Sequence, residues 1–265
     1  MKRINLLLLA ICLLLIAPDL SAQTLLNKIK KSGELRVGLT GTQPPFSMKT
    51  KAGGLIGYEV DLAELLASGM GVKVNYVEMP FADLIPALEK GEVDVVMSNI
   101  TMTLERNMKV AFKGPYMISG KSILTKTPTL KSVTSPGEIN NEFTKIAVLK
   151  SSTSEDYARE NTPMAKITIV DDYDEGIELI RNGKVDLMIA DFSICAFAVL
   201  TNTEEQFYTL NQPLSIEPIG LAMPASDPLF LNIVDNFFVF MQLNGTLDDL
   251  REKWFNDGSW LDQVK

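Results

Sequence analysis

One helix-turn-strand pattern occurs twice in the chain, and it limits the folds that the chain can adopt. Residues 81–99, FADLIPALEKGEVDVVMSN, align with residues 173–191, YDEGIELIRNGKVDLMIAD, at a constant offset of 92 residues. The alignment pairs aromatic with aromatic at the start, glycine with glycine at the turn, and Val-Asp with Val-Asp at the head of the strand. One such unit alone is common, but a second unit with the same spacing favours two related α/β lobes.

The rest of the chain also alternates between strands and helices. β-branched runs bounded by glycine or proline predict strands, and apolar residues recur at helical spacing between them. The predicted strands cover residues 35–39, 72–79 and 93–98 in a first set and residues 145–150, 166–171 and 185–191 in a second. Residues 227–255 predict two helices joined at Asn244-Gly245. This order is typical of an α/β fold whose sheets contain parallel strands.

Polar residues stand at the ends of the two repeated strands. Asn99 ends the first strand and Asp191 ends the second. Open α/β sheets bind ligands outside the carboxyl ends of their strands. The two strand ends therefore predict a ligand-binding cleft.

The N-terminus has the layout of a secretory signal peptide. Lys2 and Arg3 precede the apolar run INLLLLAICLLLIA, and Pro18 and the small pair Ser21-Ala22 follow it. The alternative is a membrane anchor, but the apolar run is shorter than the roughly 20 residues that a spanning helix needs. We expect residues 1–22 to be cleaved, which would leave Cys195 as the single cysteine and exclude an internal disulfide.

Composition excludes several classes of function. The 265 residues carry a net charge of −8, which disfavours nucleic acids and anionic membranes as partners. The chain has no histidine, the usual general base and the commonest metal ligand. Most hydrolase chemistry is therefore disfavoured, and we expect no catalytic residues, no metal and no cofactor.

Several segments together resemble a known family. ELRVGLTGTQPPFSM, GGLIGYEVDLAELLASGMGVKVNYVEM, VDVVMSNITMTLER, GKVDLMIAD and LNGTLDDLREKWF occur in the order found in bacterial extracellular solute-binding proteins that serve polar-amino-acid ABC transporters. The resemblance implies the two-lobed type II periplasmic-binding fold, each lobe a mixed sheet flanked by helices, joined by two crossing hinge strands. It places lobe 1 at residues 23–122 and 220–265, lobe 2 at residues 123–219, and the crossings near Gly120–Lys126 and Ile216–Met223.

A free amino acid needs a partner for its carboxylate once water is excluded, and the resemblance places that partner in TMTLER. Arg106 matches the family position that binds the carboxylate, and its planar fork can engage both oxygens. Thr101 matches a second carboxylate-binding position, and Ser98 or Ile100 would add a contact. The alternative for Arg106 is a solvated residue in a first helical turn that Thr103 caps.

For the ligand's ammonium group, Asp191 matches the carboxylate of lobe 2 in the family. The alternative is a helix N-cap before Phe192. Thr153 matches a threonine at a helix start that also meets the ligand carboxylate, and Ser152 precedes it. Both could instead be plain helix caps.

The residues around the ligand side chain are less distinctive. Phe81 matches a position that packs against the ligand, although an aromatic at this spacing is often core. Gln43 stands where many relatives have an aromatic ring. Thr40 stands where binders of basic amino acids often have an acid, which argues against lysine, arginine or histidine as the ligand.

The sequence thus predicts a monomeric extracytoplasmic, periplasmic protein that captures an amino acid or similar small zwitterion by hinge closure. Its partner would be the membrane permease of an ABC importer. Two alternatives stay open, a ligand-sensing subunit of a signalling receptor and a periplasmic cyclohexadienyl dehydratase-like enzyme. The enzyme needs a placed proton donor, and no further acid follows Asp191 in ADFSICAFAVL.

Overall fold

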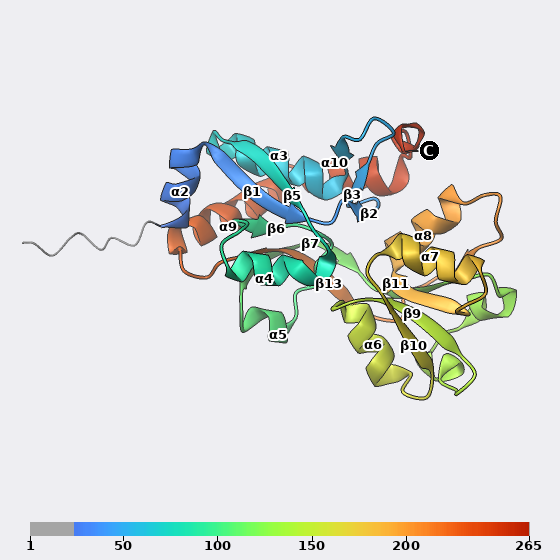
Figure 1. Ribbon diagram of the computed structural model, residues 1–265. Helices are drawn as coiled ribbons and strands as arrows, with labels where there is room; N and C mark the ends of the chain where they lie inside the picture. The colour runs from blue at the N-terminus through green and yellow to red at the C-terminus, as the bar shows by residue number, and fades with distance from the viewer. Residues whose placement is uncertain (1–23, 265) are drawn as a thin grey trace, which may run out of the picture.

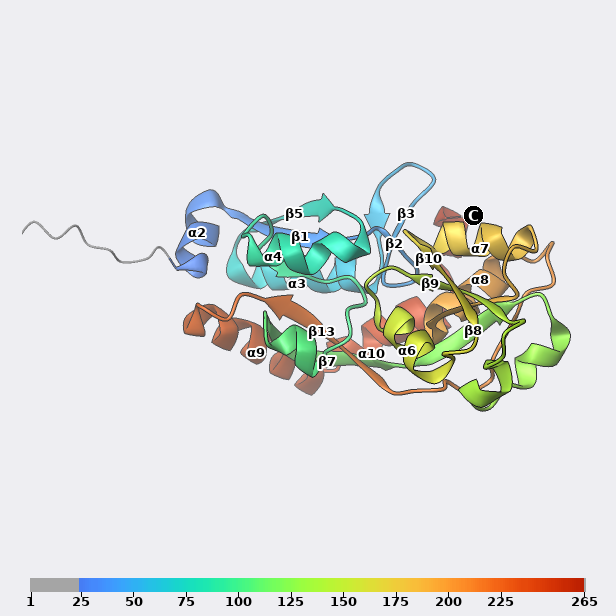
Figure 2. The same cartoon turned by 60° about the horizontal axis from the view of Figure 1, so that its bottom comes forward.

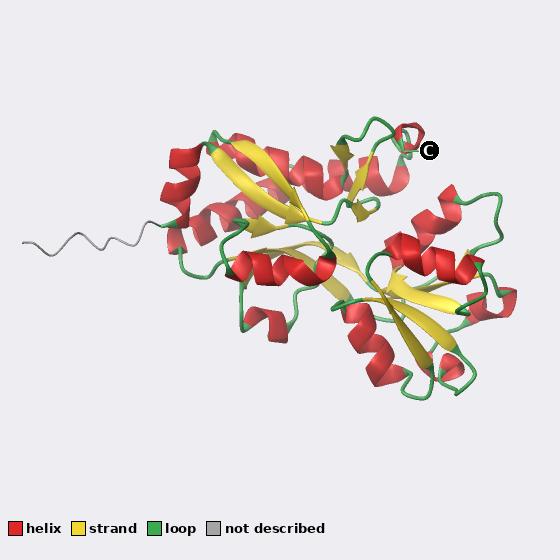
Figure 3. Ribbon diagram, in the orientation of Figure 1, coloured by secondary structure: helices red, strands yellow, loops and turns green. Residues whose placement is uncertain are grey.

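The protein forms two lobes, each built on a five-stranded sheet with helices on its faces (Figures 1 and 3). The computed structural model describes residues 24–264. The predicted signal peptide, residues 1–22, lies outside the described residues. Within residues 24–264, no helix is both long enough and apolar enough to cross a membrane.

The sheet of lobe 1 combines the first part of the chain with one strand from beyond lobe 2. Its order is β5-β1-β6-β13-β7, with β1 parallel to β5 and β6, and β13 antiparallel to β6 and β7. The strands are β1 (Glu34–Leu39), β5 (Lys73–Glu78), β6 (Val95–Val96), β7 (Ala111–Ser119) and β13 (Glu217–Met223). The chain thus leaves this sheet through β7 and returns to it as β13.

Apolar helix faces cover this sheet and a small second sheet extends it. The helices are α2 (Leu25–Ser32), α3 (Tyr58–Met70), α4 (Leu84–Glu89), α5 (Leu104–Asn107), α9 (Pro228–Leu243) and α10 (Thr246–Arg251). The small antiparallel sheet contains β2 (Thr42–Gln43), β3 (Ser47–Lys49) and β4 (Leu55–Ile56). The C-terminal helices pack their aromatic residues into the same core as β1 and α3, which explains why the chain's last part belongs to lobe 1.

Lobe 2 is one continuous stretch of chain. Its sheet has the order β10-β9-β11-β8-β12, parallel at β10-β9-β11 and antiparallel at β8. The strands are β8 (Lys121–Thr125), β9 (Lys145–Leu149), β10 (Lys166–Val170), β11 (Leu187–Asp191) and β12 (Tyr208–Thr209). The flanking helices are α6 (Thr153–Asn161), α7 (Tyr173–Arg181) and α8 (Phe192–Thr201). The repeated unit is thus α4-β6 in lobe 1 and α7-β11 in lobe 2.

The chain crosses between the sheets twice, from β7 to β8 and from β12 to β13 (Figure 2). At the first crossing only Gly120 separates the two strands. A Cβ atom on Gly120 would lie 2.1 Å from the carbonyl oxygen of Ser215, on the returning segment. The two crossing segments can therefore approach this closely only because residue 120 has no side chain.

The strand β6 is shorter than the sequence predicts. Its ladder covers only Val95–Val96, although residues 93–98 were expected to form a strand. Met97 still donates its N–H to the Gly38 carbonyl at 3.1 Å, but Asn99 has a φ of 48°. Asparagine tolerates this left-handed conformation better than most residues. The backbone therefore turns out of the sheet at Asn99, three residues after Val96, and carries its polar residues to the lobe boundary.

An aromatic stack joins the C-terminal segment to lobe 2. The ring of Phe197, on α8, lies 5.8 Å from Trp260 at an interplanar angle of 11°. Trp260 also contacts Trp254, with ring centroids 5.2 Å apart. The C-terminal segment is held to lobe 1 as well, because Lys51 donates its N–H to the Gln263 carbonyl at 2.9 Å. The last residues of the chain thus contact both lobes.

Candidate functional site

The ends of the two repeated strands meet between the lobes. Asn99 Nδ2 donates a hydrogen bond to Asp191 Oδ2 at 2.6 Å, and both side chains are buried. These are the two residues that the internal alignment pairs at its last position. The repeat therefore brings its own equivalent positions together at the cleft.

Asp191 is a charged acceptor at this boundary and does not cap α8. Its side chain makes no capping hydrogen bond to the helix that follows. Lys121 donates from Nζ to Asp191 Oδ1 at 2.7 Å, and Glu217 Oε2 lies 3.7 Å from the same ammonium. Lys121 is 1% exposed. The buried ammonium of Lys121 thus lies between two carboxylates and holds the Asp191 side chain in place.

Arg106 extends from lobe 1 to lobe 2. Its backbone N–H donates to the Thr103 hydroxyl, so the predicted helix cap exists. The guanidinium, however, donates from Nη1 to the Thr101 carbonyl at 2.9 Å and from Nη2 to the Ser151 carbonyl of lobe 2 at 3.2 Å. It also lies 5.7 Å from the centroid of the Phe81 ring. Burial lowers the pKa of Arg106, although a guanidinium stays charged at neutral pH.

Two threonines also face each other across the boundary. The hydroxyls of Thr101 in lobe 1 and Thr153 in lobe 2 are 3.2 Å apart. Thr153 is the first residue of α6, so the ends of two unrelated segments provide adjacent hydroxyls next to a helix N-terminus. Together with the Arg106 guanidinium they form a donor-rich region that suits a carboxylate.

Other predicted residues already have partners within their own lobe. The Ser98 hydroxyl accepts from the Thr40 N–H at 3.0 Å. The Ser152 hydroxyl caps α6 and donates to the Leu149 carbonyl at 2.7 Å. Ile100 is buried, and its carbonyl accepts from the Gly220 N–H. The direct ligand contacts of these residues stay predictions.

A buried carboxyl group supports Asn99 from behind. Glu59, on α3, is fully buried and accepts from the Asn99 N–H at 2.7 Å and from the Tyr116 hydroxyl, both at Oε1. Its other oxygen has no hydrogen-bond partner. Burial raises the pKa of Glu59 to about 7, against the two hydrogen bonds that lower it. The left-handed turn at Asn99 is thus fixed by a group that titrates near neutral pH.

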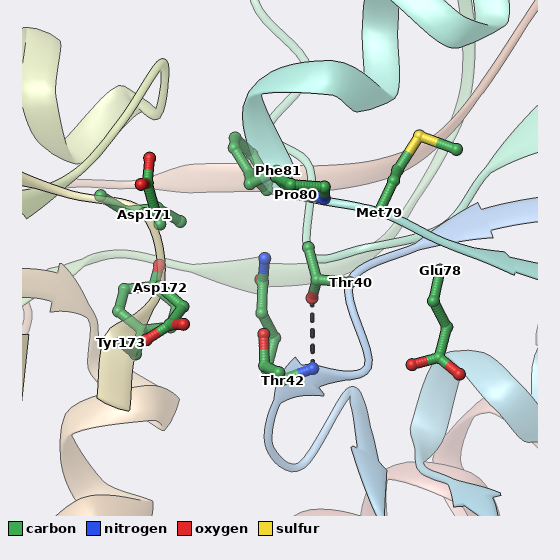
Figure 4. Close-up of a pocket in the computed structure, with 11 residues that line it drawn as sticks. Thr40, Thr42, Glu78, Met79, Pro80, Phe81, Asp171, Asp172 and Tyr173 are labelled. Atoms are coloured by element: carbon green, nitrogen blue, oxygen red, sulfur yellow. Dashed lines mark hydrogen bonds between the residues drawn. The ribbon is translucent and has the colours of Figure 1, made fainter. Parts of the chain in front are cut away.

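A cavity of about 300 Å³ opens between the lobes beside Phe81 (Figure 4). Lobe 1 contributes Thr40, Thr42, Gln43, Glu78, Met79, Pro80 and Phe81, and lobe 2 contributes Leu149, Asp171, Asp172 and Tyr173. In Figure 4, the three labelled residues of lobe 2 lie across the cavity from Thr40 and Thr42. The cavity therefore depends on both lobes for its walls.

A second cavity, of about 410 Å³, lies on the Arg106 side of Phe81. Residues of α4 and α5 line it from lobe 1, and Ser151, Glu155 and Asp156 line it from lobe 2. Phe81 lines both cavities, so its ring separates the guanidinium from the space beyond. The predicted site residues Phe81 and Gln43 belong to the first cavity, and Arg106 belongs to the second.

Sequence reasoning gave no firm role to two residues at this boundary. The ammonium of Lys121 contacts Asp191, a partner that the sequence did not indicate. Glu59 was not considered at all. The signal for Lys121 was its place directly after Gly120, where a crossing strand begins. Its position opposite Asp191, however, depends on the antiparallel pairing of β8 with β11, which the sequence alone does not specify.

Within residues 24–264, no group of three or more acidic or cysteine side chains is arranged to hold a metal ion. The polar groups at the lobe boundary can form hydrogen bonds and charge pairs. Their arrangement offers donors at Arg106 and the threonines and an acceptor at Asp191.

The chain is similar to several known proteins. The L-cystine-binding protein TcyJ of Escherichia coli K12 is 30% identical over 87% of this chain and 86% of its own length. The cyclohexadienyl dehydratase of Pseudomonas aeruginosa is 32% identical over 92% of this chain and 91% of its own. Among solved structures, the ancestral amino acid-binding protein AncCDT-1, a precursor of cyclohexadienyl dehydratase, shares 38% identity at a TM-score of 0.81, covering 88% of this chain and all of its own.

The structural similarity confirms the predicted two-lobed type II fold. The model of bacterial extracellular solute-binding proteins, family 3, matches residues 35–257, which include both lobes and both crossings. This chain therefore belongs to the family of bacterial extracellular solute-binding proteins, family 3.

Proposed function

We propose that the protein binds a free amino acid between its lobes and delivers it to the permease of an ABC importer. The observation that carries this proposal is the separation of charge across the cleft. Arg106 projects from lobe 1 and Asp191 ends a strand of lobe 2, at sites that the two halves of the chain bring together. A zwitterion has a carboxylate that can pair with Arg106 and an ammonium that can pair with Asp191.

The ligand carboxylate would take the donors next to Arg106. Its guanidinium now donates to two backbone carbonyls, and the hydroxyls of Thr101 and Thr153 lie beside it. A carboxylate offers stronger, charge-assisted bonds than neutral carbonyls. The donors come from both lobes, so a bound carboxylate would hold the lobes together.

The ligand ammonium would take free acceptor sites on Asp191. Lys121 and Asn99 account for one hydrogen bond at each carboxylate oxygen. An ionised carboxylate has about four lone-pair sites, so room for further donors remains. Lys121 would keep the Asp191 side chain in place, and the ligand would add a third donor.

Closure would occur by rotation at the two crossings. The proposed hinge lies near Gly120 and the segment before β13, with lobe bounds at residues 23–122 and 220–265 for lobe 1 and 123–219 for lobe 2. The proposal includes a periplasmic location after cleavage of residues 1–22, and a monomer in solution.

An enzymatic role is a second candidate, because one relative is named cyclohexadienyl dehydratase. That chemistry needs a proton donor near the substrate. The helix after Asp191, α8, has the sequence FSICAFAVLT and contains no acid. Other relatives, such as TcyJ, are named as amino-acid-binding proteins, so we propose a binding protein without catalytic activity. Loss of prephenate from solution on adding purified protein would contradict this.

A thermal-shift screen tests the proposal directly. Each of the twenty amino acids, with their deaminated analogues and small dicarboxylates, would be added to the purified mature protein. A ligand that binds only the folded state raises the melting temperature, and a hundredfold excess over Kd adds about 2.7 kcal/mol of stability. We expect at least one amino acid to stabilise the protein more than its deaminated analogue. If only the deaminated acids raise the melting temperature, the ligand is an organic anion and not an amino acid.

A further inference from the structure

The cavity beside Phe81 has a polar wall whose hydrogen-bonding capacity is unused. Gln43 is 1% exposed, and neither its Nε2 nor its Oε1 has a hydrogen-bond partner among the described residues. A buried polar group without a partner destabilises the folded protein. Gln43 lines the cavity between the lobes, so a ligand there is the natural partner for both of its amide atoms.

The cavity beside Phe81 lies where the end of the ligand's side chain would reach if its carboxylate met Arg106. Phe81 separates it from Arg106 and lines the spaces on both sides. A ligand whose carboxylate meets Arg106 would pass its side chain along the Phe81 ring. Its terminal group would then meet Gln43 in lobe 1 and Tyr173 in lobe 2.

The carboxylates near the cavity are already engaged. Glu78 is paired with Lys49 at 2.8 Å. Asp172 caps α7 by accepting from the Glu175 N–H at 2.8 Å. Asp171 is largely exposed and lies 3.8 Å from Lys150. Lysines thus lie beside Glu78 and Asp171, whereas the recorded partner of Asp172 is a backbone N–H that does not neutralise its charge. Exclusion of a cationic side chain therefore depends on the Gln43 amide.

The amide of Gln43 sets a stricter condition. Its Nε2 needs an acceptor and its Oε1 needs a donor. An ammonium or guanidinium would satisfy Oε1 and leave Nε2 unpaired. A carboxylate would satisfy Nε2 and leave Oε1 unpaired. A terminal group that both donates and accepts satisfies both atoms.

We propose that Gln43 selects amino acids whose side chain ends in a group that both donates and accepts hydrogen bonds. Two ligand types share this chemistry, a carboxamide and a second α-amino-acid head group on a longer chain. This inference rests on the proposed function and specifies its substrate class. It excludes simple cationic and simple acidic side chains as the preferred ligands.

Calorimetric titration with four probes tests the selection. They are L-glutamine for the carboxamide, L-cystathionine for the double-headed type, L-lysine for a cation and L-glutamate for an acid. We expect glutamine or cystathionine to bind at least tenfold more tightly than lysine and glutamate, because one unpaired buried group accounts for about that factor. The tighter of the first two identifies the terminal group.

Two substitutions at one position sharpen the test. Gln43→Met removes both the donor and the acceptor at similar volume, so it should weaken the preferred ligand about tenfold and leave L-methionine bound as well as or better than by the wild type. Gln43→Glu offers acceptors only, and it should move the preference toward lysine. Melting temperatures of both variants close to that of the wild type would show that the fold is intact.

The outcomes separate this inference from the proposed function. Wild-type protein that binds lysine or glutamate most tightly overturns the selection by Gln43 and leaves amino acid binding in place. Unchanged affinity of Gln43→Met for the preferred ligand also overturns it. Wild-type protein that binds none of the twenty amino acids nor cystathionine overturns the proposed function, and the inference with it.

Discussion

The two repeated units begin alike and end differently. In lobe 1, β6 leads through the left-handed turn at Asn99 into a loop that carries Thr101 and then into α5, which carries Arg106. In lobe 2, β11 ends at Asp191, and α8 begins at the next residue. One strand end thus presents donors and a cation, whereas the other presents a carboxylate. A duplicated scaffold can provide a site for a zwitterion by changing only the few residues after each strand.

Removal of the Arg106 guanidinium in lobe 1 should have the largest effect on amino acid affinity. Arg106→Ala should lower amino acid affinity by about 2–5 kcal/mol, because it removes one partner of a desolvated charge pair. Titration calorimetry would measure the loss. Arg159→Ala, a surface change on α6, is the matched control and should bind normally. Normal binding by Arg106→Ala would show that the carboxylate lies elsewhere.

Neutralisation of the Asp191 carboxylate in lobe 2 should have the second-largest effect on amino acid affinity. Asp191→Asn keeps the shape of the side chain and removes its charge, so amino acid affinity should fall by about 2 kcal/mol or more. Binding of a deaminated analogue should change little. Asp186→Asn makes the same change on the same lobe at a carboxylate whose recorded hydrogen bond is to the Lys145 N–H. Equal loss for the amino acid and its deaminated analogue would indicate that Asp191 acts only by positioning its neighbours.

Substitutions can exchange the donor and the acceptor of the hydrogen bond between Asn99 and Asp191. Asn99→Asp would place two carboxylates where a 2.6 Å hydrogen bond now joins the lobes, and should disfavour closure by about 1–2 kcal/mol. The double variant Asn99→Asp with Asp191→Asn restores one donor and one acceptor. Small-angle scattering with saturating ligand should show a more open Asn99→Asp and partial recovery in the double variant. A single variant as compact as the wild type would mean that the contact does not hold the lobes.

The buried carboxyl group of Glu59 in lobe 1 should have the smallest effect. It should appear as a pH dependence of the free energy of unfolding. Glu59 has a pKa of about 7 in the folded protein, above its ordinary value of 4.5, so the folded state binds more protons between these values. Its contribution to stability is present below pH 4.5 and is lost as pH rises through 7. From pH 6 to pH 8 the free energy of unfolding should fall by about 1 kcal/mol more in the wild type than in Glu59→Gln. Chemical denaturation at both pH values measures the difference, and parallel pH profiles would contradict it.

The sequence predicted the parts of the fold that depend on local pattern. The repeat, most strand positions, the helix at Phe192 and the two C-terminal helices follow from periodicity and turn residues. The two-lobed fold followed from the family resemblance. The ends of strands were less predictable, since β6 stops at Val96 because Asn99 turns the backbone.

Features of the site that depend on long-range pairing could not be predicted. Lys121 meets Asp191 because β8 and β11 pair in antiparallel register, and single-sequence patterns do not fix that register. The unused amide of Gln43 is visible only when the surrounding atoms are known. Arg106 and Asp191 were nominated because the chain matches a family throughout, and their ligand contacts stay predictions.

The stack between Phe197 and Trp260 gives the protein an intrinsic optical signal. Trp254 and Trp260 are the only tryptophans in the sequence, and they lie side by side. Trp260 is 5% exposed, with its second aromatic neighbour on the other lobe. Separation of the lobes would move Phe197 away and admit water to the indole, which shifts its emission to longer wavelength. Ligand titrations could therefore be followed by fluorescence in unlabelled protein, with Phe197→Leu as the variant that should lose most of the signal while still binding.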